Sequence, residues 1–173
     1  DSASISGLYL VADDASDKRL AMLANDYQYQ WRPDEVVPWH WTNGTTTLSL
    51  YDVEQPESAS EITTVNIEGY LVDSRRIGNL LYLITRSTPT LEGFIPYPAT
   101  SEDRASNQQA INNADINDLL PQYIDGAGAT NNLVSAQNCL VPNAESSSLR
   151  SPSIVTISAI NLQDASDINS VCM

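Results

Sequence analysis

The chain has 173 residues and a formal net charge of −14, from 22 acidic and 8 basic residues. Its length fits one domain, and its few basic residues form no cluster, so nucleic acid and anionic membrane surfaces are not expected partners. No apolar run approaches the roughly 20 residues of a membrane-spanning helix. The polar residues are mostly uncharged, as is common in exported bacterial proteins. We therefore expect a secreted, periplasmic or cell-surface protein that does not span the membrane.

Short apolar or alternating segments predict β-strands along the whole chain. In chain order they are 7–12, 45–53, 61–68, 70–77, 79–86 and 153–162. Residues 80–85 are apolar throughout, which favours a strand covered on both faces. Gly78 and Asn79 lie between two apolar runs and predict a tight hairpin turn.

Two long segments interrupt these strands. The first, 13–44, includes DKRLAML at 17–23, which predicts one or two helical turns with Asp17 as the N-cap. The second, 87–152, begins with prolines and then places apolar residues at near-helical spacing, which predicts a short helical region near 106–123 with Ser106 as its N-cap. Segments this long inside a compact domain are usually functional or have structure of their own.

Two parts of the sequence repeat each other. An apolar strand at 8–12 leads through a long insertion to TLSLYDV at 47–53, and an apolar strand at 80–85 leads through another to VTISAINL at 155–162. An acidic or glutamine-containing turn follows in both places. A covered strand, an alternating strand that ends in Asp or Asn, a turn and an outer strand are typical of a β-propeller blade.

The stretch GYLVDSRRIGNLLYLITR at 69–86, with LSLYDV at 48–53 before it and DLLP at 118–121 after it, carries a family resemblance. It resembles the secreted bacterial and archaeal proteins that have a β-propeller domain distantly related to WD-40 repeats. The resemblance is strongest over about residues 45–86. It implies a mainly β fold of antiparallel propeller blades and an exported location, and it implies no catalytic residues. Because members of that family are several times longer, it also implies that this chain is a fragment.

In that frame, residues 1–68 are a partial blade with an aromatic-rich insertion at 13–44, and residues 69–173 are a second partial blade with a long insertion at 87–152. Strands 7–12, 45–53 and 61–68 become the second, third and outer strands of the first blade. The remaining three become the first three strands of the next, which gives about one and a half blades. Such a piece exposes strand edges, so we expect a homo-oligomer that forms through those edges.

An aromatic cluster in the first insertion is the strongest candidate for ligand binding. Trp31, Trp39 and Trp41, with His40 between the last two, are all the tryptophans and the only histidine of the chain. Flat aromatic faces with polar edges suit a sugar ring or a peptide. The alternative, which we favour, is that these side chains anchor the loop and that His40 is a packed, hydrogen-bonded histidine.

Carboxylates near the end of the first strand are the candidate metal ligands. Asp13, Asp14 and Asp17 could serve calcium, which prefers clustered carboxylate and carbonyl oxygens. No EF-hand pattern is present, and acidic loops are usually only solvated, which is the interpretation that we favour. Apart from calcium, we expect no cofactor.

The two cysteines, Cys139 and Cys172, allow one disulfide. Both lie in polar, loop-like sequence, and their spacing with a single histidine excludes a redox motif or a zinc site. In an exported protein we predict that they are bonded to each other.

The sequence gives little support for nucleophilic catalysis, since it has no G-x-S-x-G motif and one histidine. We therefore expect a non-enzymatic, extracytoplasmic binding or scaffold module that contacts a protein or glycan ligand through its insertions. The alternative is a fragment of a propeller-type hydrolase acting on polysaccharide, because that chemistry needs only two carboxylates and carboxylates are plentiful.

Overall fold

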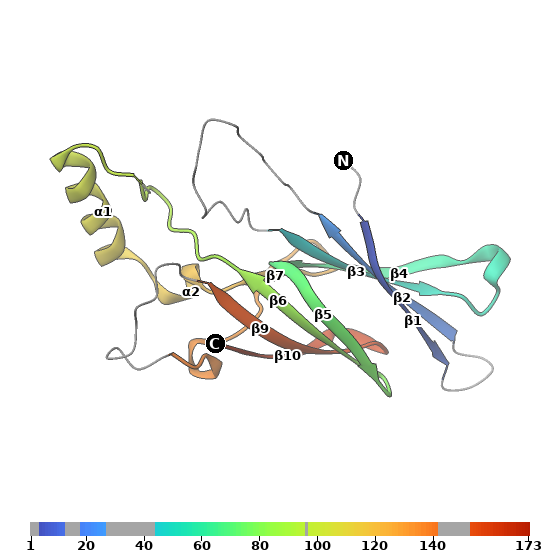
Figure 1. Cartoon of the computed structure of the whole chain (residues 1–173). Helices are drawn as coiled ribbons and strands as arrows, with labels where there is room; N and C mark the ends of the chain where they lie inside the picture. Colours follow the sequence, from blue (N-terminus) through green and yellow to red (C-terminus); the bar gives the residue numbers. More distant parts are fainter. Residues whose placement is uncertain (1–3, 13–17, 27–43, 96, 142–152) are drawn as a thin grey trace.

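The computed structural model describes residues 4–12, 18–26, 44–95, 97–141 and 153–173. Its strands form two antiparallel sheets that lie face to face (Figure 1). Four strands that follow one another in the chain make up what we call the first meander: β1 (Ser4–Ala12), β2 (Lys18–Asp26), β3 (Thr45–Asp52) and β4 (Ser60–Glu68). A short hairpin extends this sheet beyond β4: β7 (Gln122–Ile124) and β8 (Thr130–Asn132).

The other sheet is a second up-and-down arrangement of four strands, the second meander. It runs in the order β10-β9-β6-β5 and contains β5 (Tyr70–Ile77), β6 (Leu80–Ser87), β9 (Ile154–Asn161) and β10 (Asp164–Cys172). Gly69, with a φ of +107°, turns the chain from β4 into β5, and a Cβ at this position would lie 3.0 Å from the carbonyl oxygen of Arg86. Glycine therefore suits the crossing between the two meanders better than any larger residue.

Helices are few and lie between the strands. They are the 3₁₀ turns η1 (Pro56–Ser58) and η2 (Ala136–Asn138), and the α-helices α1 (Ser101–Asn113) and α2 (Ile116–Leu119). In both meanders a long segment joins the second strand to the third. In the second meander this segment holds α1, α2, β7, β8 and η2.

The hydrophobic core lies between the two meanders. The first contributes Val11, Ala21, Leu23, Leu48, Leu50, Val65 and Ile67, and the second contributes Leu81, Leu83, Ile160, Leu162 and Ala165. Leu133, from the insertion of the second meander, also packs in this cluster. Burial of side chains of this size stabilises the folded state by roughly 1.5–3 kcal/mol each, so contact between the sheets is the main source of stability.

The predicted helical turns at 17–23 are wrong, because residues 18–26 form strand β2. Leu20 and Met22 alternate with the fully buried Ala21 and Leu23, which is strand spacing rather than helix spacing. Good helix formers are held extended here because β2 pairs along its length with both β1 and β3. The strand at 7–12 is consequently the first strand of its meander, not the second.

Strand β10 was not predicted, because its sequence DASDINSVC is mostly polar. Only every second residue needs to be small or apolar, and Ala165, Ser170 and Cys172 meet this requirement as buried residues. With β2 and β10 added, the chain has two four-stranded meanders where about one and a half were expected. The mainly β, antiparallel fold, the hairpin turn at Gly78 and the helical region of the insertion are confirmed, although α1 begins at Ser101 rather than Ser106.

The pairing register makes the two meanders equivalent residue by residue. TLSLYDV in β3 aligns with TISAINL in β9, which matches Ser49 with Ser158. Met22 of β2 pairs with Ser49, as Leu83 of β6 pairs with Ser158. The internal repeat noticed in the sequence is therefore a repeat of pairing geometry across all four strands.

Three local details recur at equivalent positions. The first strands have a bulge at the same place, between Ile5 and Gly7 in β1 and between Leu71 and Asp73 in β5. The third strands end in the same turn, where the Asp52 or Asn161 side chain accepts a hydrogen bond from the backbone N–H two residues later, at 2.9 and 3.0 Å. The third and fourth strands also share a hydroxyl pair, described next.

The shared hydroxyl pair shows that each meander has two distinct faces. Ser49 and Thr64 are 2.9 Å apart on the side of the first meander that faces away from the core, whereas Ser158 and Ser170 are 2.8 Å apart on the side of the second meander that faces the core. We call the face with the hydroxyl pair the back face and the other the front face. The core is thus the front face of the first meander packed on the back face of the second.

Candidate functional site

Several residues singled out in the sequence lie outside the described residues. These are Trp31, Trp39, His40 and Trp41 of the aromatic cluster, and Asp13, Asp14 and Asp17 of the acidic loop. Their roles stay predictions. The predicted disulfide is confirmed, since Cys139 and Cys172 are bonded to each other with 4.3 Å between their Cα atoms.

The insertion of the second meander projects from the two sheets, and its helix α1 stands apart from them (Figure 1). The helix begins with a capping box: Asp103 N–H donates to Thr100 Oγ1 at 3.1 Å, and the Thr100 N–H donates to Asp103 Oδ2 at 3.0 Å. These bonds lower the pKa of Asp103, chiefly through the backbone N–H of Thr100. The local sequence therefore sets where this helix starts without help from the core.

One buried asparagine holds the segment that precedes α1 against the helix. Asn107 Nδ2 donates to the carbonyl oxygen of Ile95, and the Ile95 N–H donates to Asn107 Oδ1, both at 2.7 Å. A side-chain amide that makes both bonds to one residue replaces the pairing that a strand neighbour would provide. Asn107 is the one buried residue of α1, a helix that is described throughout its length.

Exposed apolar side chains gather on this projecting part of the chain. Phe94 and Ile95 precede the helix, Tyr97 lies in the approach to it, and Ile111 is one turn along from Asn107; these side chains are 37–58% exposed. The adjoining α2 adds Ile116, which is 58% exposed. Exposed apolar side chains on such a projection can contact another molecule. We call these five residues the platform.

The rest of the insertion ties the two sheets together. Hairpin strand β7 pairs with β4, and the N–H of Gln122 in β7 donates to a carboxylate oxygen of Glu68 in β4 at 3.1 Å. Further along, the disulfide joins Cys139 to Cys172 in β10 of the second meander, and the Leu140 N–H donates to the Cys172 carbonyl oxygen at 2.7 Å. The platform is thus anchored to both meanders.

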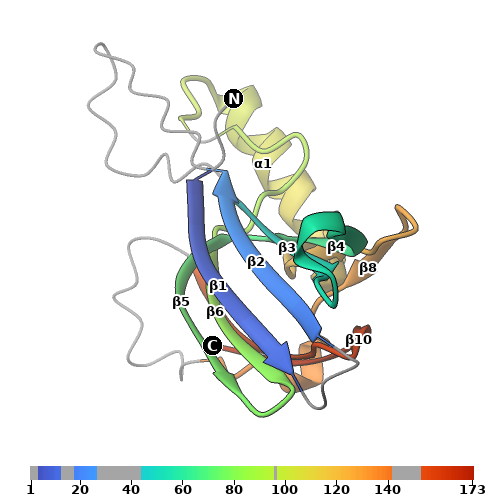
Figure 2. The same cartoon turned by 90° about the vertical axis from the view of Figure 1, so that its right-hand side faces the viewer.

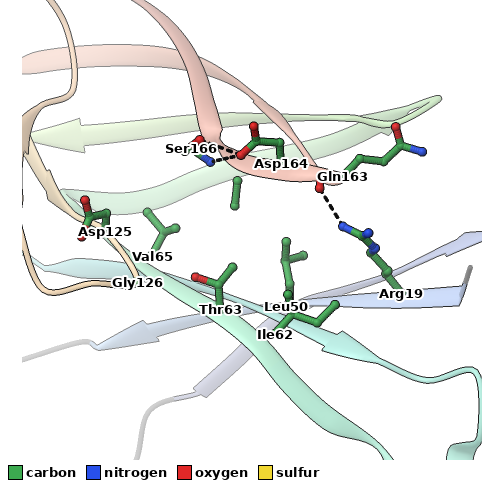
Figure 3. A pocket seen from close by; sticks show the side chains of 11 residues that line it. Arg19, Leu50, Ile62, Thr63, Val65, Asp125, Gly126, Gln163, Asp164 and Ser166 are labelled. Atoms are coloured by element: carbon green, nitrogen blue, oxygen red, sulfur yellow. Dashed lines mark hydrogen bonds between the residues drawn. The ribbon is translucent and has the colours of Figure 1, made fainter.

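A hollow of about 240 Å³ lies between the two meanders, beside the turns that follow β7 and β9 (Figure 3). Its floor is apolar and its rim is polar. The apolar lining comes from Leu50, Ile62, Val65 and Ala165, and the polar lining from Arg19, Thr63, Asp125, Gln163, Asp164 and Ser166. Gly126 completes the wall, and a Cβ there would overlap the hydroxyl of Thr63, so only glycine fits this close approach.

Hydrogen bonds lower the pKa of the two carboxyl groups of the rim. The pKa of Asp125 is lowered mainly by the backbone N–H of Ala129, which lies 2.9 Å from Oδ1. The pKa of Asp164 is lowered mainly by the hydroxyl of Ser166, which lies 2.6 Å from Oδ1. Both carboxylates accept hydrogen bonds from their own turns and place negative charge on this side of the rim.

Arg19 places a positive charge on the other side of the rim. Its guanidinium donates to the carbonyl oxygens of Gln163 at 2.7 Å and Leu162 at 3.3 Å, and so links β2 to the turn after β9 (Figure 3). This contact joins the two meanders directly.

Sequence reasoning missed both the hollow and the platform. Asp125 and Asp164 each begin a short turn. The sequence could have indicated these turns by an Asp with a Gly or Ser one or two residues later. Nothing local in the sequence places these turns beside each other, because they belong to different sheets. For the platform, the signal was Phe94, Ile95 and Tyr97 close to Pro96 and Pro98, a loop with more large apolar residues than a solvated loop needs.

Two further observations concern metals and membranes. Within residues 4–12, 18–26, 44–95, 97–141 and 153–173, no group of three or more His, Cys, Asp or Glu side chains is arranged to hold a metal ion. Among the helices of the same ranges, none has the length and apolar character that crossing a membrane would require.

A comparison of the sequence with protein-family models shows which family the chain belongs to. The family model described as a beta propeller domain matches residues 1–173, the whole chain. The chain belongs to the beta propeller domain family. Each meander of this family member accordingly has the four antiparallel strands of a propeller blade, and the two open sheets are those of a partial propeller. Neither the comparison with curated proteins nor the comparison with solved structures finds a match.

Proposed function

We propose that this chain is a non-enzymatic binding or scaffold module that works outside the cytoplasm, and that the platform is its contact surface. The observation that carries the proposal is the platform itself: exposed aromatic and aliphatic side chains on a projection fixed by Asn107, by the capping box of α1 and by the disulfide. These local bonds reduce the conformational entropy that the segment would lose when it binds.

The extracytoplasmic location is supported by chemistry. A disulfide persists in an oxidising compartment and is rare in the reducing cytosol. The strongly acidic composition, with few basic residues, opposes contact with nucleic acid. The ligand that fits is a protein surface or a glycan, since both offer apolar patches to Phe94 and Tyr97.

The experiment measures retention of the purified chain on peptidoglycan, chitin, cellulose and an array of extracellular proteins. We expect at least one of these probes to retain the protein. The double variant Phe94→Ser/Tyr97→Ser should bind about tenfold more weakly, since a few aromatic anchors carry most of the energy of such contacts. Val72→Ser, which changes a similarly exposed side chain on β5 outside the hollow, is the matched control and should bind as the unaltered chain does.

The same panel separates binding from hydrolysis. Release of reducing sugar from a polysaccharide probe would support the alternative of a hydrolase fragment and contradict the proposal. Equal loss of binding in the platform variant and in Val72→Ser would also contradict it, because the platform would then have no special part in binding. No retention on any probe would leave the platform without a ligand of the proposed class and would overturn the proposal as stated.

A further inference from the structure

We propose that the hollow between the two meanders binds a small aliphatic amine, with its ammonium group at Asp125 and its hydrocarbon chain on the apolar floor. None of the residues involved belongs to the platform, so this site stands or falls separately from the proposed function. Three features of the hollow support it: the apolar floor, the hydrogen-bond acceptors at one end and the uneven placement of charge along the rim.

The floor of the hollow is apolar and rests on the hydrophobic core. Leu50 and Val65 are 1% and 2% exposed and belong to the cluster between the meanders. Ala165, in the same cluster, reaches the floor from the second meander. Ile62 is 46% exposed, so about half of its surface remains in contact with solvent. A hydrocarbon chain that covers Ile62 removes apolar surface from water, which favours binding.

The size of the hollow limits the ligand to a short chain. Its volume of about 240 Å³ is below the roughly 300–1,000 Å³ of pockets that enclose drug-sized molecules. The side chains of its floor are aliphatic, so a flexible saturated chain can follow their surface.

The Asp125 carboxylate is held in place at one end of the hollow and keeps an acceptor site for a ligand. Its Oδ1 accepts hydrogen bonds from the N–H groups of Ala127 and Ala129 at 3.0 and 2.9 Å, and its Oδ2 accepts one from Asn131 Nδ2 at 3.2 Å. A carboxylate has about four acceptor sites, so an ammonium group can add to these bonds without breaking any of them. The turn thus positions the negative charge before a ligand arrives.

Thr63 provides a second acceptor beside the same turn. Its hydroxyl lies so close to Gly126, the residue after Asp125, that a Cβ on Gly126 would overlap it. Within the described part of the chain, no hydrogen bond to backbone or side chain uses this hydroxyl. An ammonium group has three N–H donors, so a carboxylate and a hydroxyl at the same end of the hollow suit it.

The charges of the rim are unevenly placed, which selects where a cation binds. Arg19 and Asp125 lie on opposite sides of the hollow, and Asp164 lies between them in the view of Figure 3. The Arg19 guanidinium donates to the carbonyl oxygen of Gln163, the residue directly before Asp164, at 2.7 Å. Its positive charge therefore offsets the carboxylate of Asp164 more than that of Asp125. The ammonium group is consequently favoured at Asp125.

The test compares three ligands of equal length and different charge: hexylamine, hexanol and hexanoate. Each is titrated into the isotope-labelled chain at physiological ionic strength, and the amide shifts of Thr63, Gly126 and Ser166 report occupation of the hollow. We expect hexylamine to give saturating shifts. Hexanol should bind about threefold to fivefold more weakly, which is the size of effect that an exposed ion pair provides, and hexanoate should bind more weakly still.

Three variants locate the two parts of the ligand. Asp125→Asn keeps an Oδ1 acceptor for its turn and removes the charge, so hexylamine should lose its advantage over hexanol. Asp164→Asn should reduce this advantage less, because Arg19 already offsets that charge. Ile62→Ser shortens the floor and should weaken hexylamine and hexanol alike. The amide spectrum of each variant shows at the same time that it is folded.

The matched control removes a carboxylate far from the hollow. Figure 2 shows α1 near the C-terminal end of β2, whereas Arg19 of the hollow belongs to the N-terminal end of this strand. Glu102 is an exposed residue in the first turn of α1. Glu102→Gln lowers the net negative charge by the same amount as Asp125→Asn and should leave both affinities unchanged.

Four results would each overturn the proposal. Absence of shifts at the three amides with hexylamine would mean that the hollow takes no amine. Equal binding of hexylamine and hexanol would mean that the rim does not select a cation. An equal loss in Glu102→Gln and Asp125→Asn would mean that hexylamine responds only to the overall charge of the chain. Binding of a lysine-containing peptide where hexylamine does not bind would assign the hollow to a protein partner. None of these results bears on the retention experiment for the platform.

Discussion

The two meanders of this chain have the same strand order, the same bulge in their first strands and the same turn after their third strands, yet they differ in which face is buried. The first meander buries its front face and exposes its back face, and the second does the opposite. Leu48 in β3 is fully buried, whereas its equivalent Ile157 in β9 is half-buried on an outward face. Both meanders therefore have apolar residues at equivalent positions of the repeat. Whether those residues are buried depends on whether another sheet packs against their face.

A second difference separates the fourth strands. The Thr47 hydroxyl donates to Asn66 Oδ1 at 2.9 Å across β3 and β4. The equivalent of Asn66 in β10 is Cys172, which is in the disulfide, and among the described side chains the Thr156 hydroxyl is buried without a partner. The second meander has thus exchanged a cross-strand hydrogen bond for a covalent link to the insertion.

The largest loss of stability is expected when a side chain of the buried front face is shortened. Leu48→Ala should lower the free energy of unfolding by about 3 kcal/mol, because it removes apolar contact and leaves a cavity. Ile157→Ala should cost about 1 kcal/mol in dilute protein, since its side chain is half-buried at the equivalent place. Urea titration of both variants at low concentration measures the difference, and equal losses would show that the two faces are buried alike.

Removing the disulfide should have the next largest effect. The double variant Cys139→Ser/Cys172→Ser should lose about 3 kcal/mol, because the bond closes a loop with a sequence separation of 33 residues. Thermal unfolding with and without reducing agent measures this loss, and the double variant serves as the control because reduction should not affect it. A stability that does not depend on the disulfide would mean that β7 and Leu133 alone hold the insertion to the sheets.

A smaller effect should separate the two threonines. Thr47→Val should cost about 1 kcal/mol, because it removes a part-buried hydrogen bond and leaves Asn66 Oδ1 without this donor. Thr156→Val should be neutral or stabilising, because it removes a buried hydroxyl that has no partner. Urea titration of the two variants side by side checks this, and an equal cost at both positions would contradict the exchange described for Cys172.

The smallest effect should appear at the start of α1 in acid. Hydrogen bonds from the backbone N–H groups of Thr100 and Ala99 lower the pKa of Asp103 in the folded state. A lowered pKa means that the stabilisation is complete above the unfolded value of about 3.9 and is lost as the pH falls through the folded value. The protection of the first-turn amides against exchange, relative to the intrinsic rate at the same pH, should therefore fall below about pH 4. In Asp103→Asn this pH dependence should disappear, and its persistence there would assign it to another group.

The fold could be predicted from the sequence where the pattern is local. Residues 45–53 and 61–68 alternate in polarity, and residues 80–85 are apolar throughout, so all three segments were expected as strands. Strand β2 escaped prediction because Lys18, Arg19, Leu20, Ala21 and Met22 are good helix formers that only pairing with β1 and β3 holds extended. Strand β10 escaped because its buried positions are filled by Ala, Ser and Cys rather than by large apolar residues.

The candidate sites were harder to predict because they depend on contacts between distant segments. The Cys139–Cys172 bond needed only two cysteines and an expected compartment, and it was predicted. Arg19 of β2 lines the same hollow as Asp125 and Asp164, which are more than 100 residues away in the chain, and no periodicity in the sequence encodes that arrangement. The platform depends on the pairing of Asn107 with Ile95, which a pattern of helical spacing does not reveal.

The measurement that tests the account most directly is a methyl NOE spectrum of the chain with labelled leucine and isoleucine. Packing of front face on back face predicts NOEs between sheets from the methyl groups of Leu48 and Leu50 to those of Leu81, Leu83 or Ile160. In dilute protein, the methyl groups of Ile84 and Ile157 should show NOEs only within their own sheet. NOEs from Leu48 to Ile84 or Ile157 in dilute protein would mean that two front faces meet, which contradicts the propeller-like order of the two meanders.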